Sequence, residues 1–367
     1  MDVSKVPPRQ AVDQLRAVLD SPEVARLIAT LEYVRWTGRP GYPVRAMVGM
    51  MLAKSIYSLP TWSRTCRLVA EHPALQAVLG CAPSQWACYR FARQMRERDG
   101  WALSQCVNDV LAALRDTHPE MGRNVAIDAS DLPAYANGHR NNHDGSERKT
   151  FSDPDASWGH RSAVGTRGAG GFYGYKVDAA VDVATGLPLA WSVRSAKHAE
   201  QNFALALIDQ TKAQGFKVQT AIMDKGYDSG PLHDLCMYRG VAPIIALKET
   251  EGVKRGAGEP PHCAHGEWTF AGADYKRKAT KWRCPTGECG AKSMWVKADR
   301  LHPLIPRESK RFKDLYRSRS AIEREFGRLK HEWSLLPLRV RGLDRVRLHA
   351  DVTILAKLAV ALHAGHS

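Results

Sequence analysis

Four side chains near the C-terminal end of the sequence combine a hydroxyl, two cations and a carboxylate at helical spacing. They stand at positions i, i+3, i+7 and i+14 and are Tyr316, Arg319, Glu323 and Lys330. On a helix these positions fall within an arc of roughly 60°. Such a line could hold a metal ion through its carboxylate and phosphate through its cations. Glu325 would point nearly opposite, so Glu323 is the acid of this group. The spacing is equally compatible with an amphipathic helix that carries ordinary surface charges.

Two aspartates follow short apolar segments in the middle of the sequence. Asp224 stands where the expected strand Thr220–Met223 runs out into DKGYDS, and Gly226 allows a tight turn after it. Asp128 has the same placement in AIDASDLPAYA, with Asp131 as its local competitor. A carboxylate at a strand tip is held by rigid backbone, although a lone aspartate there is more often a turn residue or a cap.

Three carboxylates from distant parts of a chain suit the cleavage of a phosphodiester. The reaction requires stabilisation of an attacking and a leaving oxygen at a charged phosphorus, and two divalent ions about 4 Å apart provide it. Mg²⁺ prefers hard oxygen ligands and keeps several waters, so a few carboxylates and a substrate phosphate complete its shell. If the three acids converge in the fold, they would repel one another unless cations are bound between them.

The composition favours a polyanionic partner. The 367-residue chain has a formal net charge of +15 and a pI near 9.5, and Lys and Arg gain free energy by displacing counterions from phosphate. The first residues contain no apolar signal core. The longest apolar stretch, Met47–Leu52, is far too short to span a bilayer. We therefore expect a soluble, cytoplasmic protein with no membrane association.

Two kinds of structure must position these side chains. Residues 1–120 carry apolar residues at spacings of three and four, which predicts a helical N-terminal domain. Ser84 is expected to cap an arginine-rich helix within it. Short helices followed by a basic one resemble a helix-turn-helix reader of DNA, and a plain helical bundle explains them equally well. From residue 121 onward strands and helices alternate, with Tyr173–Val183 and Leu189–Val193 as a predicted hairpin.

The C-terminal half contains an insertion and two further helices. Residues 249–310 are rich in Lys, Gly and Pro and interrupt the α/β pattern. The hydroxyl, cations and carboxylate described above fall on one predicted helix, Lys313–His331. A last apolar helix, from about Val346 to Leu362, carries no obvious chemistry and is expected in the core.

Cysteine usage argues against disulfides. Eight cysteines in this length are too few for a disulfide framework, and a cytoplasmic chain keeps its thiols reduced. Within the insertion, His262 and His265 lie near Cys263, Cys284 and Cys289. The spacing lacks a paired C-x2-C, so we expect free thiols at these three cysteines rather than structural zinc.

The motif Y-x2-R-x3-E-x6-K resembles the signature around the third acidic residue in one large group of bacterial insertion-sequence transposases. Residues 316–330 fill its four places without a shift. DKGYDS and AIDASDLPAYA resemble the second-acid and first-acid motifs of the same family, and GRPGYPVRAMVGMMLAKSIY resembles a segment of its helical N-terminal domain. The resemblance extends over nearly the whole chain, as far as RVRGLDRVRLHADVTILAKLA. Members of this group are DDE-type transposases, whose catalytic core is ribonuclease-H-like.

The resemblance implies an α/β fold. A ribonuclease-H-like mixed sheet with flanking helices would occupy residues 121–367, with the insertion at about 249–310. An all-α domain of residues 1–120, associated with DNA binding in the family, would precede it.

The resemblance also assigns roles to the candidate residues. It implies three catalytic acids that bind Mg²⁺, for which Mn²⁺ can substitute. The first acid would bridge two ions, and the other two would each bind one. These acids are Asp128, Asp224 and Glu323. The side chains expected to bind DNA are Tyr316, Arg319 and Lys330.

The implied function is transposition. The protein would cut double-stranded DNA at the terminal inverted repeats of its element and join the free 3′-ends to target DNA by direct transesterification. Two ends must be paired, so a homodimer on DNA is expected. Two rivals are a ribonuclease-H-fold nuclease without strand transfer and a domesticated DNA-binding protein that lacks activity.

Overall fold

The computed structural model describes residues 9–34, 41–139, 146, 149–161, 168–199, 201–248 and 259–364. Within these ranges the N-terminal part is helical, as predicted. Serine and threonine side chains begin several of the helices by accepting a backbone N–H, and the predicted cap at Ser84 is confirmed by its bond from the Ala87 N–H. The helices are α1 (Arg9–Asp20), α2 (Pro22–Tyr33), α3 (Val44–Ile56), α4 (Trp62–Glu71), α5 (Pro73–Leu79), α6 (Gln85–Gln94), a π-helical turn (Met95–Asp99) and α7 (Gly100–Thr117).

A mixed sheet lies at the centre of the molecule. Its strand order is β2-β3-β1-β5-β6, with β4 also paired to β3. Strand β3 runs antiparallel to β1 and β4, whereas β5 and β6 run parallel to β1. The predicted hairpin is formed by β3 and β4. The strands are β1 (Asn124–Pro133), β2 (Ser157–Arg161), β3 (Gly170–Asp182), β4 (Pro188–Ser195), β5 (Thr220–Met223) and β6 (Ala242–Ile245).

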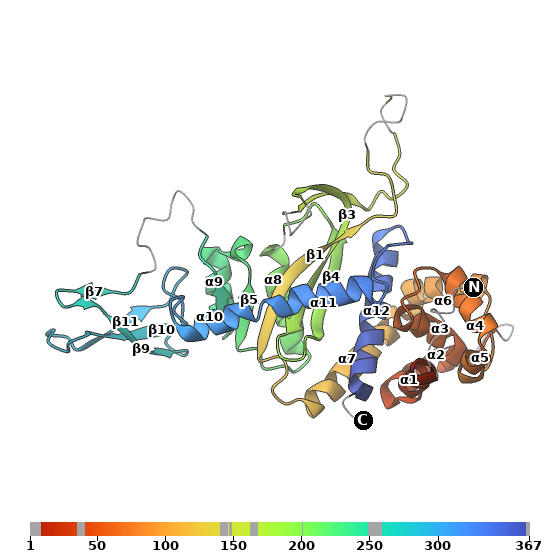
Figure 1. Cartoon of the computed structure of the whole chain (residues 1–367), viewed down its shortest axis with the longest axis horizontal. Helices are drawn as coiled ribbons and strands as arrows, with labels where there is room; N and C mark the ends of the chain where they lie inside the picture. Colours follow the sequence, from red (N-terminus) through yellow and green to blue (C-terminus); the bar gives the residue numbers. More distant parts are fainter. Residues whose placement is uncertain are drawn as a thin grey trace.

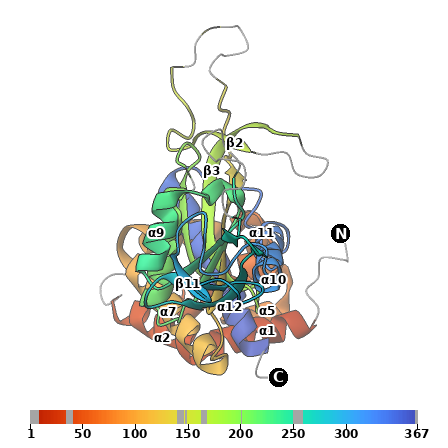
Figure 2. The same ribbon diagram turned by 90° about the vertical axis from the view of Figure 1, so that its left-hand side faces the viewer.

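Helices cover both faces of this sheet. Helices α8 (Gln201–Ala213) and α9 (Gly230–Tyr238) follow β4 and β5 on one face, while α10 (Lys310–Arg317) and α11 (Ser320–His331) cover the other face (Figure 2). The buried side chains of α11 include Ile322, Phe326 and Leu329, which form its apolar stripe. A charged helix can therefore lie across the strands and still be fixed by packing.

The predicted helix Lys313–His331 is two helices. The chain turns between α10 and α11 through tighter i to i+3 hydrogen bonds, in which the N–H groups of Arg319 and Ile322 donate to the carbonyls of Tyr316 and Arg319. The apolar spacing continues through this turn, so periodicity alone gave no sign of the break. Tyr316 consequently belongs to α10, and Arg319 immediately precedes α11.

The insertion lies at the opposite end of the molecule from the N-terminal helices (Figure 1). Its described part forms a three-stranded antiparallel sheet in the order β11-β10-β9 and a small hairpin of β7 and β8. Asp228, buried after β5, holds the two ends of the insertion: it accepts hydrogen bonds from the Lys248 N–H and the Arg300 guanidinium. The strands are β7 (His262–Cys263), β8 (Gly266–Glu267), β9 (Thr269–Asp274), β10 (Ala279–Arg283) and β11 (Ser293–Lys297).

The last helix, α12 (Leu343–Ala364), joins the helical part to the sheet. It packs against β4 on one side and against α3, α7 and α1 on the other, so the predicted core helix Val346–Leu362 is confirmed. One continuous apolar core runs from the N-terminal helices through α12 to the sheet. Among the described residues, no helix has the length and apolar character needed to cross a bilayer.

Candidate catalytic site on the central sheet

Asp128 and Asp224 lie at the same level on neighbouring parallel strands. The ladder between β1 and β5 pairs Asn124 with Thr220 and Ala126 with Ile222, an offset of 96 residues. The same offset relates Asp128 to Asp224, one on β1 and the other directly after β5. Adjacent strands are about 4.8 Å apart, so two aspartates predicted from distant motifs stand side by side at one edge.

Local backbone fixes both carboxylates. The Asp128 carboxylate accepts the N–H of Ala129 at 2.8 Å, and the Asp224 carboxylate accepts the N–H of Gly226 at 2.7 Å. A Cβ added at Gly226 would lie 2.8 Å from the Asp224 Oδ1. The sequence suggested a turn as the reason for this glycine, and the structure gives a second reason, which is room for the neighbouring carboxylate.

Arg319 links the first strand to the third acid. Its guanidinium lies 2.6 Å from the Glu323 Oε1 and 3.6 Å from the Asp128 Oδ2. Burial opposes the charge of Arg319, but the two carboxylates outweigh that effect and raise its pKa. A permanent cation therefore stands between two of the three predicted acids.

Tyr316 connects this group with Asp224. Its ring stacks on Phe312 with centroids 5.8 Å apart. Burial raises the pKa of the Tyr316 phenol, and the charges of Asp224 and Glu323 add to the rise against the opposing charge of Arg319. The hydroxyl stays protonated at neutral pH and can donate a hydrogen bond to an anion.

Lys330 occupies the far end of the same helix face. Its ammonium donates a hydrogen bond to the Ser130 hydroxyl at 2.7 Å, two residues beyond Asp128 on β1. Because alternate strand residues share a face, Asp128 and Ser130 both face α11, and Asp131 belongs to the other face, in register with Lys176. The geometry thus favours Asp128 over its competitor, while the DNA-binding role of Lys330 stays a prediction.

The two acids of α11 have different environments. Glu323 is 54% exposed and pairs with Arg319, whereas Glu325 is buried and its carboxylate lies 2.7 Å from the Lys357 ammonium on α12. Burial raises the pKa of Glu325 to about 7, against the opposing charge of Lys357. The two acids therefore lie on different faces of α11, as their spacing predicts, and the catalytic role of Glu323 stays a prediction.

Sequence reasoning missed a basic cavity between the N-terminal helices and the start of α12. It has a volume of about 500 Å³ and is lined on both sides by arginines, with aromatic rings among them. No carboxylate appears among its lining residues in the described part of the chain. Each half was visible as an arginine-rich segment, but nothing in the spacing indicated that they meet. The basic residues are Lys54, Arg90, Arg93, Arg96, Arg339, Arg341, Arg345 and the uncharged His349.

Two aspartates lie on adjacent strands, and a glutamate on a helix that crosses these strands lies near the first of them. This arrangement defines a carboxylate site on a mixed sheet. Residues 120–357, about two thirds of the chain, match the family model described as Transposase DDE domain. Residues 3–88 match the model described as Transposase domain (DUF772). The chain therefore belongs to the DDE-type transposases of insertion sequences, and the family indicated by the Y-x2-R-x3-E-x6-K motif is confirmed.

More distant comparisons add little. A cryo-EM structure of the piggyBac transposase synaptic complex with hairpin DNA aligns with 98% of this chain and 77% of that chain, at 11% sequence identity and a TM-score of 0.42. A likeness of this extent assigns no residue. Among curated proteins, none matches the sequence.

Proposed function

We propose that the protein cuts DNA at the terminal inverted repeats of an insertion sequence and joins the 3′-ends to target DNA. The observation that carries this proposal is the convergence of Asp128 and Glu323 on Arg319, next to the register-matched Asp224. The order β4-β3-β1-β5-β6, with β3 antiparallel to β1, supports a ribonuclease-H-like core. Membership of the transposase family supports DNA as the substrate.

The donor set fits Mg²⁺, with Mn²⁺ as a substitute. Three carboxylates offer hard oxygens, and Arg319 already supplies positive charge between two of them. Asp128, Asp224 and Glu323 would hold two divalent ions, which supply activation of the attacking oxygen and neutralisation of the leaving oxygen. Arg319 would then exchange its carboxylate partners for a phosphate of the transposon end, which its planar guanidinium binds through two parallel hydrogen bonds.

The remaining side chains of the signature position the DNA. The protonated Tyr316 hydroxyl donates a hydrogen bond to a phosphate oxygen, and Lys330, held over β1 by Ser130, acts as a point charge. Water attacks the phosphorus, the bond to the 3′-oxygen breaks, and a free 3′-hydroxyl remains. That hydroxyl later attacks a target phosphodiester, so one phosphodiester bond replaces another and no covalent protein intermediate forms.

The basic cavity supports DNA binding by the N-terminal domain. Arginines from α6 and from the segment before α12 face each other across it. Two exposed rings stand at its edge, Trp86 at 75% and Tyr89 at 46% exposure. Phosphate contacts release counterions from DNA, so a carboxylate-free groove of this size suits the backbone of a terminal repeat. Pairing of two ends would require a homodimer on DNA.

The test is a cleavage and strand-transfer assay with the terminal sequences of the element, in Mg²⁺ or Mn²⁺. Wild type is compared with Asp128→Ala, Asp224→Ala and Glu323→Ala, and Asp131→Ala serves as the matched control on the opposite face of β1. Cutting and joining should depend on metal and disappear in the three site variants, while binding of the ends persists.

Each rival function predicts a different result in this assay. A nuclease would cut without joining. A domesticated DNA-binding protein would bind the ends and never cut. Loss of activity in Asp131→Ala with retention in Asp128→Ala would move the first acid to the other face of the strand.

A further inference from the structure

The described part of the insertion has a very small apolar core of its own. The buried cluster among its strands consists of Trp268, Trp282 and Cys284. Large apolar side chains remain exposed on the same unit, among them Met294 at 38% and Trp295 at 46% exposure. Units of about 40 residues bury too little surface to fold by packing alone, and metals or disulfides usually stabilise them.

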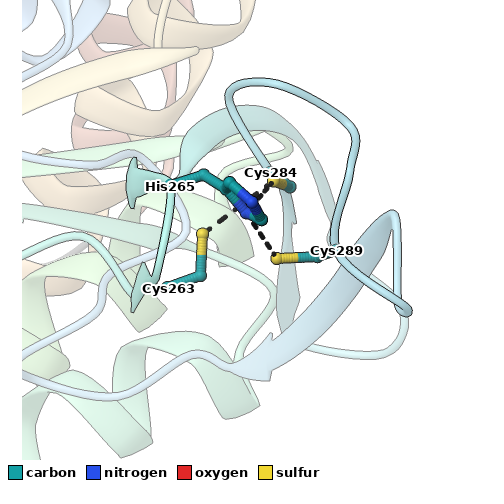
Figure 3. Close-up of side chains that lie close together, drawn as sticks. All are labelled: Cys263, His265, Cys284 and Cys289. Atoms are coloured by element: carbon teal, nitrogen blue, oxygen red, sulfur yellow. Dashed lines mark hydrogen bonds between the residues drawn. The ribbon is translucent and has the colours of Figure 1, made fainter.

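Three thiols and one imidazole meet beside this cluster. The ligand atoms of Cys263, His265, Cys284 and Cys289 all lie within 4.8 Å of one another, and the four side chains point toward a common centre (Figure 3). The cysteines are free thiols in the structure. Two ligand pairs that lie apart in the sequence therefore share one small volume.

The separations fit a tetrahedral ion. The Sγ atoms of Cys263 and Cys284 are 3.9 Å apart, and the His265 Nδ1 lies 3.4 Å from the Cys289 Sγ and 3.9 Å from the Cys284 Sγ. With Zn–S near 2.3 Å and Zn–N near 2.0 Å, tetrahedral geometry places two sulfurs about 3.8 Å apart and sulfur and nitrogen about 3.5 Å apart. The four side chains therefore need little movement to bind zinc.

Two loops supply the ligands in pairs. The β7–β8 hairpin carries Cys263 and His265, with Gly266 at a φ of 111°. The loop after β10 carries Cys284 and Cys289, with Gly287 at a φ of 74°. A glycine adopts these left-handed conformations without the steric cost that a Cβ brings. Two facing loops with a ligand pair each are the arrangement of structural zinc ribbons.

The orientation of His265 is that of a metal ligand. Its Nδ1 faces the thiols, and its Nε2 lies 3.6 Å from the Glu288 carboxylate. Metal-bound histidines usually direct their second ring nitrogen at a carboxylate or carbonyl, which fixes the tautomer. His262, the other histidine considered from sequence, turns its Nδ1 to the Pro260 carbonyl at 2.6 Å.

We propose that Cys263, His265, Cys284 and Cys289 bind one structural zinc ion that holds the insertion together. Thiolate and imidazole ligands in a tetrahedral arrangement select zinc over Mg²⁺, which prefers oxygen. Four protein ligands fill the coordination sphere, so the ion has no open position for substrate and is structural. The proposal is independent of the carboxylate site and of the function proposed for it.

Metal content of the untagged, full-length protein tests the site. After purification without chelator, mass spectrometry should find about one zinc per chain. X-ray absorption should show about three sulfur ligands and one nitrogen ligand at zinc. Cys289→Ser and His265→Ala should lose most of the zinc, while His265→Cys retains it by completing a four-thiolate set. Glu288→Gln should weaken zinc binding by about tenfold, because it removes the partner of the histidine.

Two controls separate this site from other thiols and from the carboxylates. Cys81→Ser removes a half-buried thiol outside the cluster, and Asp224→Ala removes a proposed Mg²⁺ ligand; both should keep full zinc content. If the cysteine variants fail to fold, Co²⁺ uptake by the apo wild type should still give the visible bands of a tetrahedral thiolate site. Absence of zinc together with absence of those bands overturns the proposal, as does zinc that is lost in Asp224→Ala and kept in Cys289→Ser.

Discussion

The central sheet and the insertion hold their reactive side chains in opposite ways. Asp128 and Asp224 are placed by a strand ladder within an extensive apolar core, so their positions are set by backbone and packing. The insertion has a buried cluster of a few residues, and its thiols lie on two turns. We therefore expect the fold to survive removal of the sheet carboxylates, whereas the proposed zinc ligands of the insertion would themselves be the main contacts that stabilise it.

The largest effect is expected from the carboxylates of the candidate site, on the sheet and on α11. Asp224→Ala and Glu323→Ala should lower the cleavage rate by a factor of about 10³ or more, because a bound ion contributes several kcal/mol to the transition state. The urea midpoint of both variants should stay close to that of wild type, since neither side chain is part of the apolar core. A large loss of stability in either variant would show that these carboxylates help to hold the fold together, contrary to the expected difference between the sheet and the insertion.

A second prediction concerns the buried Glu325, on the face of α11 that packs against α12. Glu325 has a pKa of about 7 in the folded protein, raised by burial from an ordinary value of 4.5. The unfolded chain releases this proton more easily, so between about pH 4.5 and 7 the contribution of Glu325 to stability falls as pH rises, by at most about 3 kcal/mol. Glu325→Gln should remove this part of the pH dependence.

Urea denaturation of wild type and Glu325→Gln at pH 5 and pH 8 measures that contribution. The difference between the two proteins matters, because other groups titrate in both. Glu71→Gln, an exposed position at the end of α4, should behave as wild type. An identical pH dependence in wild type and Glu325→Gln would show that the carboxylate is charged throughout the range.

Chelation should affect the insertion alone. Treatment with EDTA in the absence of Mg²⁺ should increase tryptic cleavage within residues 259–299 by about tenfold or more, because structural zinc contributes its binding energy to folding. The sheet and the N-terminal helices should keep their wild-type fragment pattern. Equal protection of the insertion with and without chelator would mean that it folds without metal.

The smallest effects are expected in the basic cavity. Arg90→Ala and Arg345→Ala should each weaken binding to a terminal repeat a few-fold and reduce the slope of log affinity against log salt by about 1. Arg16→Ala, on α1 and paired with Asp13, is the control and should leave the slope unchanged. Unchanged slopes in all three variants would place the DNA elsewhere.

Sequence reasoning succeeded where one local rule decided the outcome. Helical spacing placed Glu323 and Glu325 on different faces of α11, and an apolar strand running into DKGYDS placed Asp224 directly after β5. It failed where distant segments meet. The break before α11 depends on three-residue hydrogen bonds around Arg319 that periodicity does not record. The cavity requires α6 and the segment before α12 to face each other. The closeness of Cys263, His265, Cys284 and Cys289 was likewise invisible in the sequence, because the two pairs have irregular spacings and come from different loops.

The position of α12 has a consequence for synthesis. Its buried face completes a core that α1, α3 and α7 begin more than two hundred residues earlier. Domains generally fold in the order in which they leave the ribosome, but these helices remain an open half-structure until α12 emerges. A chain that ends before α12 lacks the helix that completes this core, so we expect it to form no compact N-terminal fragment. The N-terminal helices and the central sheet therefore complete their shared core in the same folding step.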